Sequence, residues 1–175
     1  ITYDGLIMDN WKMLTLVGED HPGIVAAVTN SLYQNGWNLG ETSMIRLGGN
    51  FTIMMMVTGE GDVQAALQPV ANRLKLRMHV DDISGGLHQH LVPNIQVRVN
   101  GADRAGIVAQ VTGVLADVGF NILELESDVA GSREVPFYIL NIQGYTDETL
   151  EQLEQALGAL GDIDVSVAAV ETLIG

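Results

Sequence analysis

The sequence predicts an α+β protein made of two copies of one β-α-β-β-α-β unit, each with an antiparallel sheet. The first observation is an internal repeat. Residues 14–43 align with residues 97–126 at an offset of 83 positions without a gap, and 12 of the 30 aligned residues are identical. The second is the hydrophobic pattern, which changes from alternation to a helical period and back in the same order in both copies. A repeat of this length fits tandem small domains better than a solenoid.

Each copy opens with a short apolar strand, residues 13–17 in the first and 95–99 in the second. A polar loop containing glycine follows, and the apolar residues then recur at helical spacing. Gly36 and Gly119 are placed to end these two helices in the left-handed conformation that glycine tolerates. The residues expected on one helical face are Ile24, Val28, Ser31, Leu32 and Asn35 in the first copy, and Ile107, Val111, Val114, Leu115 and Val118 in the second.

Two further strands, a second helix and a final strand complete each copy. Right-handed connections turn this order into a four-stranded antiparallel sheet with both helices on one face, which is the ferredoxin-like arrangement. The remaining elements are expected at 38–47, 50–57, 62–74 and 77–83, and at 121–129, 135–142, 147–160 and 164–170. The expected division is a tail over 1–11, a first domain over 12–84, a linker over 85–93 and a second domain over 94–175.

Composition excludes several classes of function. The chain has 8 Lys and Arg against 22 Asp and Glu, a formal net charge of −14, and so lacks the basic surface that nucleic-acid binding requires. It has no cysteine, which excludes disulfides and thiolate metal sites. No apolar run is long enough to span a bilayer and no signal peptide is visible, so we expect a cytoplasmic protein without membrane contact.

The second face of the first sheet predicts an additional layer. Met54 and Met56 point away from the expected helices and are nevertheless apolar. Strands that are apolar on both faces are usually covered on both. The cover could be the other copy, another subunit or the N-terminal tail, where Leu6, Ile7, Met8 and Trp11 could form a packed strand. We expect a homodimer.

The loop before the first helix, residues 18–23, is the main candidate for a ligand site. Asp20, and Asp103 in the second copy, are placed to cap the following helix, and Pro22 fits its first turn. Free N–H groups at a helix N-terminus favour an anion such as a carboxylate, and Gly23 lets a ligand approach the backbone. The alternative is a well-capped helix start without a ligand, which spacing alone favours.

Asn38 and Asn121 occupy the same position in the two copies, just after the glycine that ends the helix. An amide offers donors and an acceptor, which suits the ammonium and carboxylate groups of an amino acid. Equally, Asn is common after a helix because it tolerates left-handed geometry. The sequence leaves both interpretations open.

No catalytic or metal site is expected. His88 and His90 alternate like metal ligands on a strand, but they lie in a linker-like segment, and no further ligand completes a site. His21 and His79 have no evident nucleophile as a partner. We therefore predict a protein without catalytic activity, metal or cofactor.

Both copies open Gly-x-Asp-x-x-Gly-Ile-Val and continue to Gly-aromatic-Asn-Leu/Ile, which resembles ACT domains over residues 12–172. ACT domains are small regulatory modules that commonly bind amino acids at interfaces between paired domains. The stretches VGEDHPGIVAAVT and LGGNFTIMMMVTG also look like the glycine cleavage system transcriptional repressor group. Its familiar Asp-Arg-Pro-Gly becomes Asp-His-Pro-Gly at His21 and Asp-Arg-Ala-Gly at Ala105.

The resemblance implies a non-enzymatic regulator that binds a small amino acid, glycine or serine first, and controls a protein partner, with transcription of glycine cleavage as one such process. Members of the repressor group are thought to contact an activator protein rather than DNA. The alternative is the ACT regulatory fragment of an amino-acid or one-carbon metabolic enzyme such as formyltetrahydrofolate deformylase, which requires this chain to be part of a longer protein that carries the catalytic domain. The ligand-binding residues implied are Asp20, His21, Pro22, Gly23, Ile24, Asn38 and Leu39, with a weaker site at Asp103, Arg104, Gly106, Ile107, Asn121 and Ile122.

Overall fold

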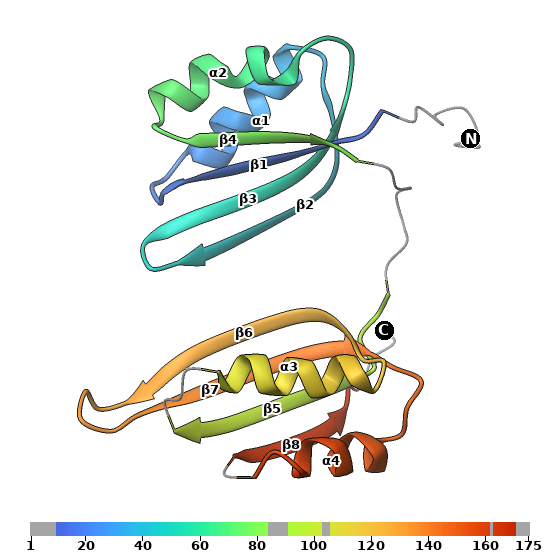
Figure 1. Ribbon diagram of the computed structural model, residues 1–175. Coiled ribbons are helices and arrows are strands. Elements are labelled where there is room, and N and C mark those ends of the chain that lie inside the picture. The colour runs from blue at the N-terminus through green and yellow to red at the C-terminus, as the bar shows by residue number, and fades with distance from the viewer. Residues whose placement is uncertain (1–9, 84–90, 103–105, 162, 171–175) are drawn as a thin grey trace. The chain divides into compact units, whose positions relative to one another are not determined.

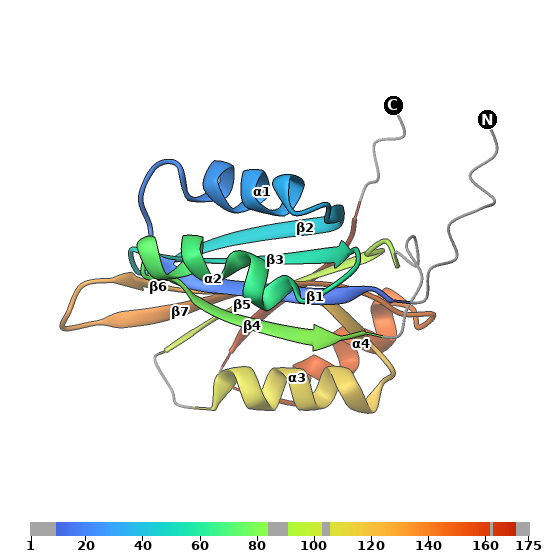
Figure 2. The ribbon, with the colours of Figure 1, turned by 90° about the horizontal axis from the view of Figure 1, so that it is seen from above.

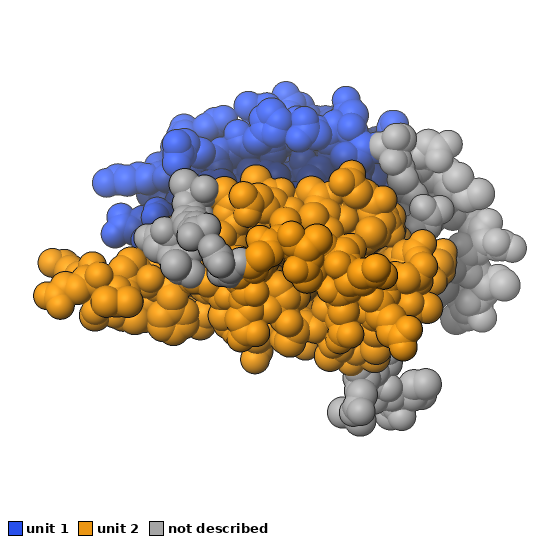
Figure 3. Space-filling model, turned by 60° about the horizontal axis from the view of Figure 1, so that its bottom comes forward, with its two compact units in different colours: residues 1–89 blue, residues 90–175 orange. Residues whose placement is uncertain are grey.

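The computed structural model describes residues 10–83, 91–102, 106–161 and 163–170. The chain divides into two compact units, residues 1–89 and residues 90–175 (Figure 3). Each unit has the β-α-β-β-α-β order and a four-stranded antiparallel sheet, so the predicted fold class is confirmed (Figure 1). Among the described helices, none is long and apolar enough to cross a membrane. The bounds expected for the tail, linker and domains stay a prediction.

The first unit has the strand order β2-β3-β1-β4, and both helices lie on one face of this sheet (Figures 1 and 2). The hairpin between β2 and β3 turns through Gly48 and Gly49, both at positive φ. Trp11 extends the sheet by one residue, because its carbonyl accepts the Ile83 N–H at 3.1 Å. The elements are β1 (Lys12–Glu19), α1 (Ile24–Gln34), β2 (Asn38–Leu47), β3 (Asn50–Thr58), α2 (Val63–Arg73) and β4 (Arg77–Asp82).

The second unit repeats this arrangement with the order β6-β7-β5-β8. Its β6–β7 hairpin is longer than the first unit's. β6 ends at Gly131, two residues beyond the expected end at residue 129. The elements are β5 (Ile95–Ala102), α3 (Ile107–Asp117), β6 (Asn121–Gly131), β7 (Pro136–Tyr145), α4 (Leu150–Gly158) and β8 (Asp164–Ala169).

Each unit has its own core between the sheet and the two helices. On α1 the residues Ile24, Val28 and Leu32 are buried, as the helical spacing predicts, whereas Asn35 is exposed. The expected ends of α1 and α3 are confirmed, since Gly36 and its counterpart in the second unit have φ values of 76° and 69°. The inward alternation on β3 is also confirmed: Phe51, Ile53, Met55 and Val57 all lie in the first core.

The faces without helices differ in chemistry between the two sheets. Met54 and Met56 lie on this face of the first sheet, because they alternate along β3 with core residues such as Met55. They pair with Thr15 and Met13 of β1. Met54 is 44% exposed, whereas Met56 is buried. The tail residues expected to pack here, 6–8, lie outside the described part of the chain. By strand register, Met13, Met54 and Met56 correspond to Gln96, Asn141 and Gln143 of the second sheet.

Candidate functional site

The helices that follow the candidate loops both begin at a left-handed glycine. Gly23 is the N-cap of α1 with φ 91°, and Gly106 is the N-cap of α3 with φ 111°. The prediction that Asp20 caps α1 is therefore wrong, and Pro22 precedes the cap instead of lying in the first turn. The other expected cap, Asp103, lies outside the described residues.

The other two helices are capped by side chains. The Asp62 carboxylate accepts the Ala65 N–H at 3.1 Å at the start of α2, and Thr149 forms a capping box at the start of α4. At α1 the first helical hydrogen bond runs from the Ala27 N–H to the Gly23 carbonyl at 3.0 Å, and no side chain of the described residues caps the N–H groups before it. These groups therefore remain available to an anion, which the helix dipole also favours.

Gly23 is required by its backbone conformation. An added Cβ would meet nothing within 4 Å, so no neighbour excludes a larger side chain. A φ of 91° is nevertheless a conformation that L side chains rarely adopt. The backbone at Gly23 thus needs a left-handed conformation, while the space around it is free. This leaves the N-terminus of α1 accessible.

Asp20 anchors the loop to the β2–β3 hairpin. Its carboxylate forms an ion pair with Arg46 of β2, and its N–H donates to the Gly49 carbonyl at 3.1 Å. This ion pair explains why Asp20 does not cap the helix. The sequence analysis did not identify Arg46. The one indication of its role in the sequence is a single cation close to the glycine turn of the hairpin. In the second unit the register places Val129 at the position of Arg46.

The two asparagines lie far from the loops of their own units. Asn38 pairs with Thr58 beside Lys12, where β1 begins, whereas the loop follows Glu19, where β1 ends (Figure 1). The seven residue steps from Lys12 to Glu19 span about 24 Å of strand. In the second unit Asn121 likewise lies near the start of β5. The structure therefore does not bring the loop and the asparagine of one unit together.

Both asparagines precede an irregularity in an edge strand. The register of β2 against β3 shifts between Leu39 and Thr42, and that of β6 against β7 shifts between Ile122 and Glu124. A bulge bends the strand and changes the direction of nearby side chains, and bulges are frequent next to functional sites. Both units thus combine an exposed amide with a bulge on an edge strand.

The remaining candidate residues divide by burial. Asp20 and Ile122 are half-buried, and Arg104 lies outside the described residues. The side chains of Ile24 and Ile107 belong to the two cores, so only their main chains are available to a ligand. The exposed candidates are His21, Pro22, Gly23, Asn38, Leu39, Gly106 and Asn121.

One titratable group near Asn121 is perturbed. The Tyr145 hydroxyl donates to the Asp147 carboxylate at 3.0 Å. This hydrogen bond, and then the negative charge of Asp147, raise the pKa of Tyr145 above its ordinary value. Tyr145 is thus the donor in this hydrogen bond, and Asp147 is the acceptor.

The histidines show no metal centre in the described part of the chain. His79 Nε2 lies 3.0 Å from an Asp81 carboxylate oxygen, and no group of three or more metal-ligating side chains is found among the described residues. His88 and His90 lie outside those residues.

The profile of the ACT domain matches this chain twice, over residues 13–83 and over residues 95–158. The chain belongs to the ACT-domain family. It contains two ACT domains in tandem, as the repeat and the element order predict. ACT domain 1 below denotes the unit that contains β1–β4, and ACT domain 2 the unit that contains β5–β8.

Known relatives fall into two groups. A UPF0237 protein from Listeria monocytogenes is 34% identical over 85 residues, which cover 44% of this chain and 96% of the relative. The glycine cleavage system transcriptional repressor of Escherichia coli is 24% identical over 126 residues, which cover 70% of this chain and 66% of the repressor. The tandem ACT protein is thus related to that repressor over 70% of its own chain.

Two solved structures share the tandem fold. One is the crystal structure of an unknown protein from Galdieria sulphuraria, with a TM-score of 0.72, 23% identity and coverage of 93% of this chain and 99% of that one. The other is a putative glycine cleavage system transcriptional repressor, with a TM-score of 0.70, 21% identity and coverage of 93% and 98%. At these identities the similarity establishes the arrangement of elements in both ACT domains.

Proposed function

We propose that this tandem ACT protein is a non-enzymatic cytoplasmic regulator that binds a small amino acid, glycine or serine first, and thereby controls a protein partner. The observation that supports the proposal is the N-terminus of α1, which follows the left-handed N-cap residue Gly23 and has no side-chain cap. The name of the Escherichia coli relative supports a role in transcription of glycine cleavage. The acidic composition supports a protein partner over direct contact with nucleic acid.

In this proposal the ligand carboxylate meets the free N–H groups at the start of α1. The Asp20 carboxylate is already paired with Arg46, so the ammonium group needs a different acceptor. The amide of Asn38 or Asn121 supplies one. Because Asn38 is about 24 Å along the strands from the loop of its own domain, our proposal assigns this asparagine to a different ACT domain from the loop. In this proposal the ligand therefore contacts two ACT domains of the homodimer.

Joining two domains gives the ligand a route to the partner. A ligand that bridges two domains stabilises one arrangement of them over others, and a protein that contacts both domains responds to that arrangement. Couplings of this kind are typically about 1–3 kcal/mol. We favour ACT domain 1 for the loop, because Pro22 and the Asp20–Arg46 ion pair restrict that loop and reduce the entropy lost on binding.

Thermal unfolding of the full chain with each of the twenty amino acids, followed by calorimetry, tests the proposal. A ligand at a hundred times its dissociation constant adds about 2.7 kcal/mol to the free energy of unfolding. We expect Asn38→Ala or Asn121→Ala to abolish binding with the fold intact, and the asparagine that matters identifies the bridging domain. If no amino acid binds below millimolar concentration, or if both variants bind normally, the proposal fails.

A further inference from the structure

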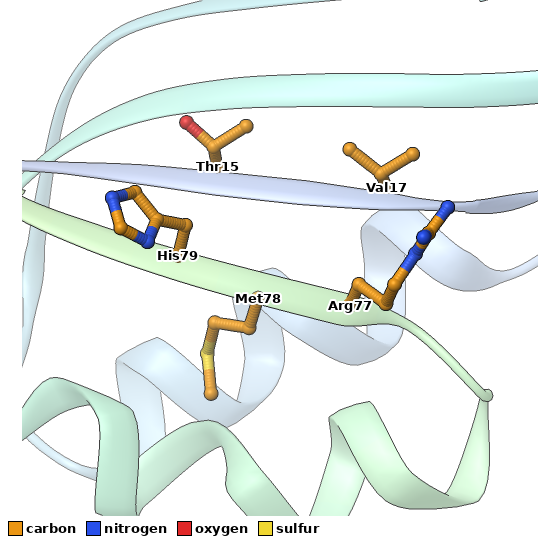
Figure 4. A pocket seen from close by; sticks show the side chains of 5 residues that line it. All are labelled: Thr15, Val17, Arg77, Met78 and His79. Atoms are coloured by element: carbon orange, nitrogen blue, oxygen red, sulfur yellow. The ribbon is translucent and has the colours of Figure 1, made fainter.

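A shallow groove lies over β1 and β4 on the helix-free face of ACT domain 1 (Figure 4). Its volume is about 150 Å³, and its lining comes from Thr15, Val17, Arg77, Met78 and His79. Thr15 lies opposite His79 and Val17 opposite Arg77 in the antiparallel ladder, so these four side chains share one face. The Met78 side chain points to the helices instead and packs against the core.

The polar groups of this groove retain hydrogen-bonding capacity. Within the described residues, Arg77 forms no ion pair, and the Thr15 hydroxyl has no hydrogen-bond partner. His79 is oriented by its contact with Asp81 through Nε2, which leaves Nδ1 available. Glu19, farther along the same face of β1, is not paired with Arg77. A guanidinium, a hydroxyl and an imidazole therefore line one small surface.

We propose that this groove binds a small carboxylate that has a short aliphatic body and no ammonium group. A guanidinium binds a carboxylate through two parallel hydrogen bonds, and Arg77 is the free guanidinium here. The Thr15 hydroxyl is a further donor. Val17 offers apolar contact for the body, and the apolar row of Met13 and Met54 continues the same face. An ammonium group would be repelled by Arg77, which separates this ligand class from the amino acid proposed above.

ACT domain 2 provides an internal comparison. By strand register, Thr15 and Arg77 correspond to Arg98 and Asp164. Arg98 is already engaged, since its Nε donates to the Asn141 amide oxygen at 3.0 Å. A carboxylate thus stands where ACT domain 1 has its free guanidinium, and this face of ACT domain 2 should not bind an anion of this class.

Nuclear magnetic resonance on the full chain with ¹³C-methyl methionine tests the proposal, with 3-methylbutanoate as the probe. We expect saturable shifts of the Met13 and Met54 methyl signals, and no such shifts with 3-methylbutan-1-ol, which lacks the carboxylate. Arg77→Gln should weaken binding at least tenfold, and Thr15→Val should weaken it less. Arg98→Gln, the matched change in ACT domain 2, should leave the affinity unchanged.

Several results would overturn the proposal. These are the absence of saturable shifts, equal shifts with the alcohol, or unchanged affinity in both Arg77→Gln and Thr15→Val. Because Arg77 is exposed, the variant should fold, and its unfolding midpoint checks this. Titrations with glycine and serine, followed in the same spectra, distinguish this groove from the loop site. Neither amino acid should produce saturable shifts of the Met13 methyl signal.

Discussion

At the scale of single residues, Gly23 shows how a backbone requirement can be separated from a packing requirement. Space is free around Gly23, so Gly23→Ala should cost only the strain of a left-handed alanine, about 1 kcal/mol in the free energy of unfolding of ACT domain 1. Gly113, inside α3, has ordinary backbone geometry and equally free space, so Gly113→Ala should instead stabilise ACT domain 2 by about 0.5–1 kcal/mol. Urea unfolding measures both, and effects of the same sign would contradict the argument.

Tyr145 gives a second prediction at this scale. Its pKa is raised because ionisation would break the hydrogen bond to Asp147 and place two negative charges together. Asp147→Asn should therefore lower the pKa of Tyr145 towards its ordinary value, as an NMR titration of the ring carbons would measure. Glu148→Gln removes a neighbouring charge without touching this hydrogen bond and is the control. A pKa that follows Glu148 rather than Asp147 would show that the hydrogen bond is not the main cause.

At the scale of elements, the loop before α1 is held by the β2–β3 hairpin. The Asp20–Arg46 ion pair is partly exposed, with Arg46 at 68%. Arg46→Gln should therefore lower the free energy of unfolding by about 0.2–1 kcal/mol, and the loss should shrink at high salt. A double-mutant cycle with Asp20→Asn measures the coupling.

Arg77, which forms no ion pair with any described residue, is the control for this cycle. Arg77→Gln removes an equal charge from the same domain, so a stability loss as large as that of Arg46→Gln would mean that general charge, not the ion pair, is responsible. The effect on the loop itself appears in amide hydrogen exchange, where the Asp20 N–H should exchange faster in Arg46→Gln because its bond to Gly49 loses support.

At the scale of the whole molecule, the helix-free faces of the two sheets differ in chemistry. A homodimer that uses the apolar face of ACT domain 1 should be weakened by Met54→Glu, because Met54 is half-exposed. Met56→Glu is less informative, since Met56 is buried and the change would also destabilise the domain. Light scattering over a concentration series measures the mass. Asn141→Glu, at the matching position of ACT domain 2, should leave association unchanged, and a monomer at every concentration would refute the homodimer.

The order of elements and both cores could be predicted from the sequence, because they rest on local information. The alternation from Phe51 to Val57 and the spacing of Ile24, Val28 and Leu32 each report which side of an element is apolar. The repeat then makes each prediction twice. The helix ends at Gly36 and its counterpart also follow from one residue's conformational freedom.

The site depended on contacts that local patterns do not contain. Asp20 looks like a helix cap in sequence, but its carboxylate pairs with Arg46, 26 positions away, and this pairing exists only once β2 folds beside the loop. Asn38 and the loop are close in sequence and belong to one motif, yet the length of α1 carries the chain back along the sheet and separates them. The sequence by itself determined the duplicated fold and its helix-facing sides. Tertiary structure decided which charges meet and which ends of the sheet carry each candidate residue, because strand register and ion pairs join segments that are distant along the chain.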